Sequence, residues 1–287
     1  MKRCLSCNAS YVSSIYNCPD CDFVPAVLDG FDSYAPDFAY SGDGYHFLDL
    51  ASSEDDNFWF QFRNKLLLWA IESYCPNFES MLEIGCGTGF ILSDIAKRFL
   101  DSTLCGSDMY IAGLGFAAAR LPSTKFMQMD ARNIPFENEF DVIGAFDVIE
   151  HIKEDEEVLT QICAALKPEG LMLLTVPQHE WLWTHVDEYS SHERRYTAAD
   201  LHQKIEAGGF QVIKSTSFIT ILLPTMMISR FFQKRVSEKN FDAAAQVKIS
   251  PWLNSLFSRI LGAELALIKR GFNLPAGGSR LVIAKKV

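Results

Sequence analysis

The feature of this sequence that most limits its fold is an alternation of short apolar runs with helical patterns, which begins at Ser80. In such an alternation each apolar run predicts a strand, and the units together predict a parallel sheet with helices on both faces. The carboxyl ends of the strands then form the ligand crevice. The predicted strands lie near residues 80–85, 102–108, 124–130, 140–147, 170–177, 210–218 and 279–286.

The turn after the first of these strands carries three glycines at alternate positions. Residues 82–90 read LEIGCGTGF, which places Gly85, Gly87 and Gly89 between a strand and a helix, with Glu83 as the carboxylate of that strand. Glycines at such a turn let the backbone pass close to a ligand. The spacing is not the G-x-G-x-x-G of a dinucleotide site, and the Gly-Lys-Ser/Thr of a phosphate-binding loop is absent. A pyrophosphate or triphosphate ligand is therefore not indicated.

Acidic residues close the next strands. Asp108 ends the second strand, where a carboxylate can accept from both ribose hydroxyls, and Asp130 ends the third, where it can accept from an adenine amino group. Asp147 follows Phe146 at the end of the fourth strand. Acidic strand ends with no basic partner fit a cationic ligand that carries no phosphate, such as S-adenosylmethionine. A helix cap or a solvated strand end is the alternative for each aspartate.

From about residue 79 to residue 177 the chain resembles the class I S-adenosylmethionine-dependent methyltransferases. LEIGCGTG is similar to the first motif of that family, MDARNIPF to its adenine-side motif, FDVIGAFDVIEHI to its fourth motif and LKPEGLMLLTVP to its fifth strand. The resemblance implies a Rossmann-like sheet and a methyltransferase activity that uses S-adenosylmethionine. The cofactor contacts it implies are Glu83, Gly85, Gly87, Gly89, Asp108, Met109, Asp130, Ala131 and Phe146.

Two C-x-x-C pairs stand near the start of the sequence. Cys4 and Cys7 form the first pair, and Cys18 and Cys21 form the second. Two facing turns of this kind predict a tetrahedral four-sulfur site, the geometry of structural zinc, and the segment resembles a zinc ribbon. Two disulfides, a redox pair or iron in the same site are the alternatives. The segment is too short for a hydrophobic core of its own, so bound metal would supply its folding energy.

These patterns divide the chain into three parts. Residues 1–30 are predicted as the zinc-ribbon-like module, residues 31–78 as a linker and an N-terminal helical lid, and residues 79–287 as the S-adenosylmethionine-binding domain. The prediction of a lid is based on the aromatic run FWFQF, and the alternative is that these aromatic side chains pack in the core. A helical insert is predicted at about 221–277; its apolar start ends in cations, among them Lys234. The insert is expected to pack as extra helices, to form a homodimer surface or to lie on a membrane surface.

Catalytic candidates come from two segments. His151 follows the fourth strand in DVIEHI, where an imidazole of unperturbed pKa, about 6.5, suits removal of a proton from an acceptor hydroxyl. Asp147 and Glu150 lie within one helical turn of it, and they either orient its ring or hold a divalent metal with it. His185 and His192 are rival bases in the loop VPQHEWLWTHVDEYSSHERRYT. The remaining alternative is a packing role for His151, with catalysis by alignment alone.

The same loop carries two further pairs of side chains. Trp181 and Trp183 are predicted as an aromatic wall of the acceptor pocket, and Arg194 with Arg195 as a clamp for an anion. A structural loop with a salt-bridged surface is the alternative.

The predicted function is methyl transfer to a small-molecule or a glycan- or lipid-linked acceptor, with O-methylation favoured. An RNA methyltransferase that uses the zinc ribbon on its substrate is one alternative, and a non-catalytic cofactor-binding module is another. The formal charge of -10 argues against nucleic acid as a partner. No apolar run reaches the ~18 residues of a membrane span and no secretory signal is recognised, so a cytoplasmic protein is expected, with membrane association through the insert left open.

Overall fold

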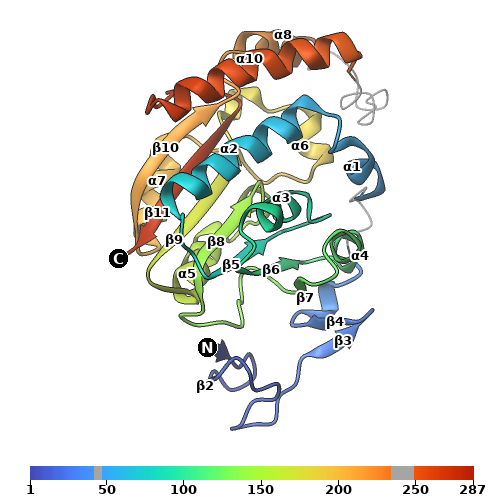
Figure 1. Ribbon diagram of the computed structural model, residues 1–287, viewed down its shortest axis with the longest axis vertical. Coiled ribbons are helices and arrows are strands. Elements are labelled where there is room, and N and C mark those ends of the chain that lie inside the picture. The colour runs from blue at the N-terminus through green and yellow to red at the C-terminus, as the bar shows by residue number, and fades with distance from the viewer. Residues whose placement is uncertain (42–46, 234–248) are drawn as a thin grey trace.

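The computed structural model describes residues 1–41, 47–233 and 249–287. Within these residues nine strands form one sheet in the order β10-β11-β9-β8-β5-β6-β7-β4-β3, while β1 (Lys2–Arg3) and β2 (Ser10–Tyr11) pair separately (Figure 1). The strands of the large sheet are β3 (Ala26–Leu28), β4 (Phe31–Ser33), β5 (Ser80–Ile84), β6 (Thr103–Asp108), β7 (Lys125–Gln128), β8 (Phe140–Phe146), β9 (Leu166–Pro177), β10 (Phe210–Phe218) and β11 (Ser279–Lys286). The α/β class predicted from the alternation is confirmed.

Helices cover the sheet in two layers. On one face pack α2, α3, α4 and α10, and on the other pack α5 and α7 (Figure 1). The helices are α1 (Phe47–Ser53), α2 (Phe58–Tyr74), α3 (Phe90–Arg98), α4 (Ile111–Arg120), α5 (Asp155–Ala165), α6 (His185–Tyr189), α7 (Ala198–Ala207), α8 (Leu223–Gln233) and α10 (Pro251–Lys269).

The central strands owe their continuous apolar runs to these two layers. Successive side chains of a strand point to opposite faces, so Met81 packs in one layer and Leu82 in the other. A strand that is buried on both faces needs no polar alternation, which is why short apolar runs identified it. The parallel strands β9, β8, β5, β6 and β7 bring their carboxyl ends to one edge, and β11 lies antiparallel between β9 and β10.

The N-terminal segment differs from its prediction. Residues expected to form a linker or ordered loop contain β4, which pairs parallel with β7, and β4 also pairs with β3 to make a hairpin. The predicted boundary at residue 30 falls in the turn of this hairpin. Each strand has three residues, too few to show an alternating pattern among the surrounding Gly, Asp and Ser. The hairpin extends the large sheet beyond β7.

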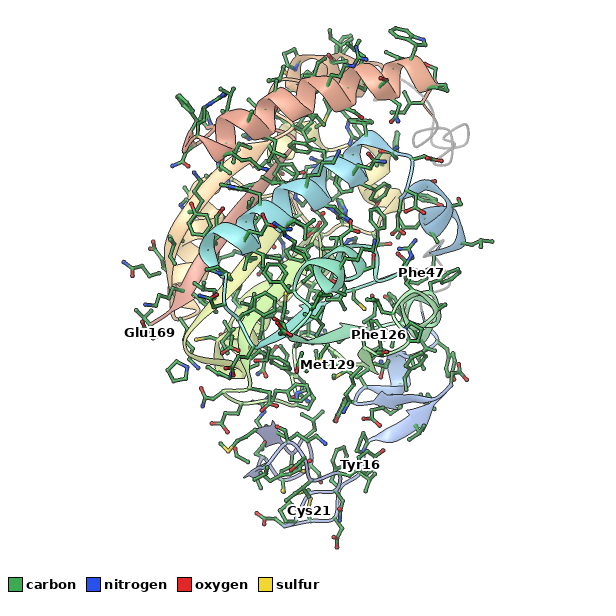
Figure 2. The ribbon with its side chains drawn as sticks, viewed as in Figure 1. Tyr16, Cys21, Phe47, Phe126, Met129 and Glu169 are labelled. Atoms are coloured by element: carbon green, nitrogen blue, oxygen red, sulfur yellow. The ribbon has the colours of Figure 1, made fainter. Side chains whose placement is uncertain are left out.

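The segment that holds the four clustered cysteines packs on the loop between β7 and β8. Lys2 forms an isolated antiparallel bridge with Phe136. The N–H of Arg3 donates to Pro135 O at 3.0 Å, and its guanidinium donates to Ile134 O at 2.9 Å. Polar contacts therefore attach this segment, which lies at the end of the molecule opposite α8 and α10, as the position of Cys21 in Figure 2 shows.

The insert between β10 and β11 is helical, as predicted, with α8 and α10 in its described parts. Asn254 of α10 accepts from Phe58 N at 2.8 Å and donates to Asp56 O at 2.7 Å, which ties α10 to the start of α2. Residues 234–248 of the predicted insert and residues 42–46 of the predicted linker lie outside the described residues. In the described part of the chain no helix combines the length and the apolar character that crossing a membrane requires.

Candidate functional site

The glycine turn after β5 has a left-handed backbone. The φ angles of Gly85, Gly87 and Gly89 are 65°, 51° and 72°. A Cβ on Gly85 would lie 2.5 Å from Val148 Cγ2, and one on Gly89 would lie 3.0 Å from Ala117. At these two positions both the backbone conformation and the packing therefore require glycine. The sequence argument assigned the bare backbone to a ligand, whereas neighbouring protein groups occupy the space beside Gly85 and Gly89.

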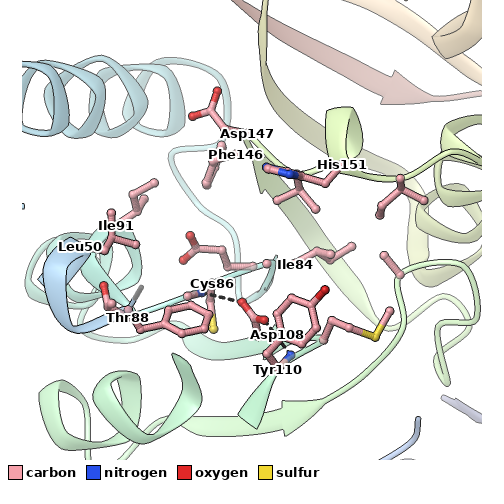
Figure 3. Close-up of a pocket in the computed structure, with 18 of the residues that line it drawn as sticks. Leu50, Ile84, Cys86, Thr88, Ile91, Asp108, Tyr110, Phe146, Asp147 and His151 are labelled. Atoms are coloured by element: carbon pink, nitrogen blue, oxygen red, sulfur yellow. Dashed lines mark hydrogen bonds between the residues drawn. The ribbon is translucent and has the colours of Figure 1, made fainter. Parts of the chain in front are cut away.

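Asp108 is fixed by the backbone of the same region. Its Oδ2 accepts from the N–H of Gly87 at 2.9 Å and its Oδ1 from the N–H of Tyr110 at 2.9 Å (Figure 3). Burial raises the pKa of Asp108 to about 6, although these hydrogen bonds act against the increase. Each carboxylate oxygen keeps a second lone pair. The oriented carboxylate can thus accept from two neighbouring hydroxyls of a ligand.

A pocket of about 580 Å³ opens at the carboxyl ends of the strands. This volume lies within the range of small-molecule sites. Asp108 lies on one side of it and Asp147 with His151 on the other (Figure 3). Gly89, His185 and His192 are not among its lining residues. The predicted site residues that do line it are Glu83, Gly85, Gly87, Asp108, Met109, Asp130, Ala131, Phe146, Asp147 and His151.

Glu83 contributes a buried carboxyl group to the pocket wall. Its side chain is almost fully buried, and its Oε2 has no hydrogen-bond partner among the described residues. Burial raises the pKa of Glu83 to about 8, while the charge of Arg63 acts in the opposite direction. A carboxyl oxygen without a partner at a pocket wall is suited to a ligand that brings a cation or a hydrogen-bond donor.

Two of the acidic strand ends do have basic partners, which corrects the expectation from the sequence. Asp130 pairs with Arg132 at 2.8 Å, and Asp147 pairs with Arg63 at 2.5 Å. Asp147 also has a positive φ of 57°, an uncommon conformation for a residue other than glycine. Asp108 differs from both, since main-chain amides donate to its carboxylate.

His151 is half-buried at the end of a short 3-10 helix, Ile149–His151. Burial and, second, the charge of His192 lower its pKa to about 4, so the expected unperturbed value is wrong. The rings of His151 and His192 meet edge to face with 4.7 Å between their centres. Because its pKa lies well below 7, the imidazole of His151 is neutral at neutral pH.

The histidine-rich loop is held together by a buried carboxylate. Asp187 is fully buried; its Oδ1 lies 2.9 Å from His192 Nδ1 and accepts from Arg195 Nε at 2.7 Å. His185 stands apart and pairs with Glu188 at 2.8 Å. The structure thus brings His192 to His151 and leaves His185 outside the pocket.

The two arginines of this loop bind protein groups instead of forming the predicted anion clamp. Arg194 pairs with Asp155 at 2.8 Å and donates to Ile152 O at 3.0 Å. Arg195 donates to Asp187 and, at 3.1 Å, to Gln178 O. Trp181 and Trp183 are absent from the pocket lining. The alternative of a salt-bridged structural loop describes this segment.

Glu150 is a second buried carboxyl group near His151. It is fully buried, and neither carboxyl oxygen has a hydrogen-bond partner among the described residues. One potential ligand atom each from Glu150, His151 and His192 lie within 4.8 Å of one another. One carboxylate and two imidazoles form a donor set that transition metals accept.

Comparison with known proteins shows the family to which this chain belongs. The profile of a methyltransferase domain matches residues 52–215, more than half of the chain. The chain belongs to this methyltransferase domain family. The recognition of a class I S-adenosylmethionine-dependent methyltransferase from its motifs is confirmed.

Curated relatives of this methyltransferase match it over part of their length. It is 26% identical over 164 residues to a probable S-adenosylmethionine-dependent methyltransferase of Mycolicibacterium smegmatis, which covers 55% of this chain and 61% of the relative. It is 31% identical over 107 residues to a ubiquinone biosynthesis O-methyltransferase of Rhodopseudomonas palustris, which covers 35% of this chain and 41% of the relative. The chain thus spans about half the length of these relatives.

Among solved structures, the methyltransferase resembles a chain of the complex between the Haloferax volcanii Trm112 methyltransferase activator and a putative methyltransferase. The two share a TM-score of 0.54 and 17% sequence identity over 84% of this chain and 97% of that chain. At this identity the likeness is one of fold.

Several pocket residues of the methyltransferase were not found from its sequence. Arg63 of α2 pairs with Asp147 and lies 4.5 Å from the ring of Trp59. Glu54, which is buried, accepts from Thr88 Oγ1 at 2.6 Å and so reaches the glycine turn. The aromatic run before Arg63 was the available signal, because it predicted a lid. Trp59 and Phe60 do line the pocket, while Phe62 packs in the core.

The four N-terminal cysteines of the methyltransferase meet as the sequence predicts. Cys4 Sγ lies 3.6 Å from Cys21 Sγ, and Cys7 Sγ lies 3.6 Å from Cys18 Sγ. A disulfide requires about 2.05 Å, and all four cysteines are free. Thiolates around zinc, with Zn–S bonds of about 2.3 Å, lie about 3.8 Å apart. The sulfur positions therefore fit a four-thiolate metal site and exclude the alternative of two disulfides.

Proposed function

We propose that this protein binds S-adenosylmethionine and methylates a hydroxyl group of a small-molecule acceptor, either free or carried on a glycan or a lipid. The observation that supports the proposal is the arrangement of one pocket. An oriented carboxylate, Asp108, stands on one side, and a neutral imidazole, His151, stands on the other side with Asp147.

The residues of the pocket fit this cofactor. The carboxylate of Asp108 is positioned to accept from ribose hydroxyls, and the unpartnered Oε2 of Glu83 suits the amino group of the methionine moiety. Asp130, oriented by Arg132, is positioned for the adenine amino group, with Met109 and Ala131 beside it in the lining. When bound, S-adenosylmethionine supplies a methyl group on a positively charged sulfur.

Cofactor binding has a direct test. A charged hydrogen-bond acceptor of this kind contributes roughly 1.5–3 kcal/mol. Asp108→Ala should therefore weaken S-adenosylhomocysteine by about tenfold or more in calorimetry. Asp101→Ala, at an exposed position before β6, is the matched control and should bind normally. Unchanged affinity in Asp108→Ala would place the cofactor elsewhere.

His151 is proposed to accept the proton that the acceptor hydroxyl loses. A pKa of about 4 makes the imidazole a weak base in the free protein. The hydroxyl, however, becomes strongly acidic as its oxygen bonds to the methyl group, so a weak base suffices late in the transfer. Asp147 raises the pKa of His151 by its charge, which favours the protonated ring once it forms. The chain's other task is to align the two reactants and exclude water.

The catalytic proposal is tested by substitution. His151→Ala should lower turnover by ~10²-fold or more with cofactor affinity nearly unchanged. Turnover is measured as labelled methyl transfer to a panel of phenols, carboxylic acids and extracted lipids. His185→Ala is the control, because His185 pairs with Glu188 outside the pocket. Wild-type turnover in His151→Ala would refute the base assignment, and failure of the purified protein to methylate any acceptor would favour a non-catalytic module.

A second mechanism is supported by the unpartnered oxygens of Glu150. A divalent metal held by Glu150, His151 and His192 would lower the pKa of a bound acceptor hydroxyl, so that no separate base is needed. A chelator distinguishes the two mechanisms. Activity lost on chelation and restored by added magnesium or manganese favours the metal, whereas activity that ignores the chelator favours the simple base.

A further inference from the structure

One end of the molecule exposes apolar side chains that the pocket does not use. In α8 Ile228 is 61% exposed, and in α10 Trp252 is 67% exposed. Leu256 and Leu267 of α10 are also exposed, as is Phe272 just after it. These helices form the end of the molecule farthest from the cysteine cluster (Figure 1). Exposed apolar side chains gathered at one end of a molecule are a feature of contact sites.

The exposed side chains of α10 lie on one side of the helix. A single face carries Trp252, Leu256, Arg259 and Ala263 of α10 and Arg270 directly after it, at spacings of four, three, four and seven residues. The opposite face packs in the core through a set of buried residues: Leu261, Leu265 and Ile268. We call the exposed side of α8 and α10 the insert face.

The charge of the insert face is opposite to that of the whole chain. The chain has 36 acidic and 26 basic residues. In the described stretches 219–233 and 249–274 the one carboxylate is Glu264, which is fully buried and accepts from Thr220 N and Ile221 N at 2.8 Å each. Arg259, Lys269 and Arg270 are exposed there. An acidic protein therefore presents a patch that is apolar and basic at one end.

We propose that the insert face binds the surface of an anionic lipid bilayer. Tryptophan and leucine next to arginine are the composition of helices that lie in the plane of a membrane interface. Anionic headgroups would neutralise Arg259 and Arg270, whereas a second copy of this face would bring like charges together. The negative charge of the rest of the molecule opposes approach in any other orientation. The insert face thus fits lipid better than self-association.

Docking of the insert face would also place the pocket near the bilayer. Asn254 and Phe257 of α10 contact Phe58 at the start of α2, with 2.8 Å from Phe58 N to Asn254 Oδ1 and 5.2 Å between the two phenylalanine rings. Trp59 and Arg63, one and five residues further along α2, line the pocket. A bilayer contact at α10 is therefore close to the part of the pocket wall that α2 forms, on the proposed acceptor side.

Vesicle sedimentation tests the proposal without any turnover, so its outcome is independent of the proposed methyl transfer. The native protein should sediment with vesicles of three parts phosphatidylcholine to one part phosphatidylglycerol, and weakly with phosphatidylcholine alone. Binding should fall as the salt concentration rises, because exposed charges are screened. Arg259→Glu/Arg270→Glu should weaken binding to the mixed vesicles by about tenfold or more. Trp252→Ser should weaken it by roughly fivefold at any salt concentration.

Control substitutions of the same kind, outside the insert face, test whether the effect is specific to that face. Leu100→Ser removes an apolar side chain that is 83% exposed in the loop after α3, and Lys97→Glu/Arg98→Glu reverses two exposed charges of α3. Both variants should bind vesicles as the native protein does, and the melting temperature of every variant is checked. Absence of sedimentation, equal binding to neutral vesicles, or a concentration-dependent dimer by light scattering that Trp252→Ser abolishes would each overturn the proposal. The last result would assign the face to a second copy of the chain.

Discussion

The large sheet carries an addition at each of its two ends, and the two additions are attached in different ways. Beyond β7, the N-terminal segment is joined through main-chain pairing of β4 and through polar contacts such as those of Arg3. Near β10 and β11, the insert is joined mainly by apolar packing of α10 against α2. The first addition is organised around its cysteines and polar groups, while the second leaves an apolar face in solvent.

Each addition is connected to a different side of the pocket. Phe38, which follows β4, lines the pocket near Arg132 on the proposed adenine side, with 5.9 Å from the guanidinium to the ring. The described residues of the insert do not line the pocket but support α2, whose Trp59 lines the proposed acceptor side. This difference predicts that changes at the N-terminal addition affect binding of the cofactor, and that changes at the insert affect binding of the acceptor.

The largest effect is expected from loss of the metal. Cys18→Ser removes one of four thiolates, and structural zinc contributes on the order of 10 kcal/mol to the folding of such segments. Metal analysis should give about one zinc per native chain and close to none in the variant, and limited proteolysis should cleave within residues 1–25. Cys163→Ser, outside the cluster, should keep its zinc. Stoichiometric iron in the native protein would contradict the zinc assignment.

The next largest effect is expected at Gln128, which links the hairpin to the adenine side. Its buried amide accepts from Ala35 N at 3.0 Å and donates to Ala35 O at 2.8 Å and Met109 O at 2.9 Å. Gln128→Leu leaves these half-buried main-chain groups without their partners and should lower the free energy of unfolding by roughly 2–4 kcal/mol. Denaturant unfolding measures it, with the exposed Gln211→Leu as control. Unchanged cofactor affinity in Gln128→Leu would contradict the prediction that the N-terminal addition affects the adenine side of the pocket.

A pH titration probes the pocket itself, apart from both additions. Free protein holds a proton on Glu83 below about pH 8. The ammonium group of the bound ligand favours the ionised carboxyl group, so binding releases this proton and becomes tighter as pH rises toward 8. Affinity for S-adenosylhomocysteine should increase up to roughly tenfold between pH 6.5 and 8.5, then level off. Calorimetry in two buffers measures the proton release, which Glu83→Gln should abolish; a flat profile in the native protein would exclude this role.

The smallest effect is expected at Asn254, the polar link from the insert to α2. Asn254→Ala removes the acceptor for Phe58 N and should cost about 1 kcal/mol of unfolding free energy. The KM for the acceptor should rise a few-fold with the Kd for cofactor unchanged. Asn273→Ala, at an exposed position after α10, is the control. An equal loss of cofactor affinity would break the division between the two additions.

The sequence predicted the features that depend on residues close together in the chain. The central strands β5, β8 and β9 were recoverable, because burial on both faces makes each one a compact apolar run. Asp108 lines the pocket, as its place at a strand end within one βα unit predicts, and its contact with a cofactor stays a prediction. The cluster of four cysteines was also predictable from local sequence, since two tight turns bring the cysteines together.

Features that depend on distant segments were missed. Arg63 reaches Asp147 from a helix 84 residues earlier in the chain, so the motif around Asp147 gave no sign of a basic partner. The pKa of His151 is lowered by burial and by His192, a neighbour that only the folded loop supplies. β4 has its parallel partner in β7, more than ninety positions away, and three residues carry no pattern of their own.

The glycine turn has a consequence for how such sequences are counted in genomes. Val148 and Ala117 occupy the places where side chains on Gly85 and Gly89 would lie, whether or not any ligand is bound. A descendant that lost His151 would still have the same packing reason to keep both glycines. The motif therefore reports ancestry and architecture, and a survey that scores chains by it will gather inactive paralogues together with enzymes. Sorting one from the other requires the opposite side of the pocket, where Asp147 and His151 lie.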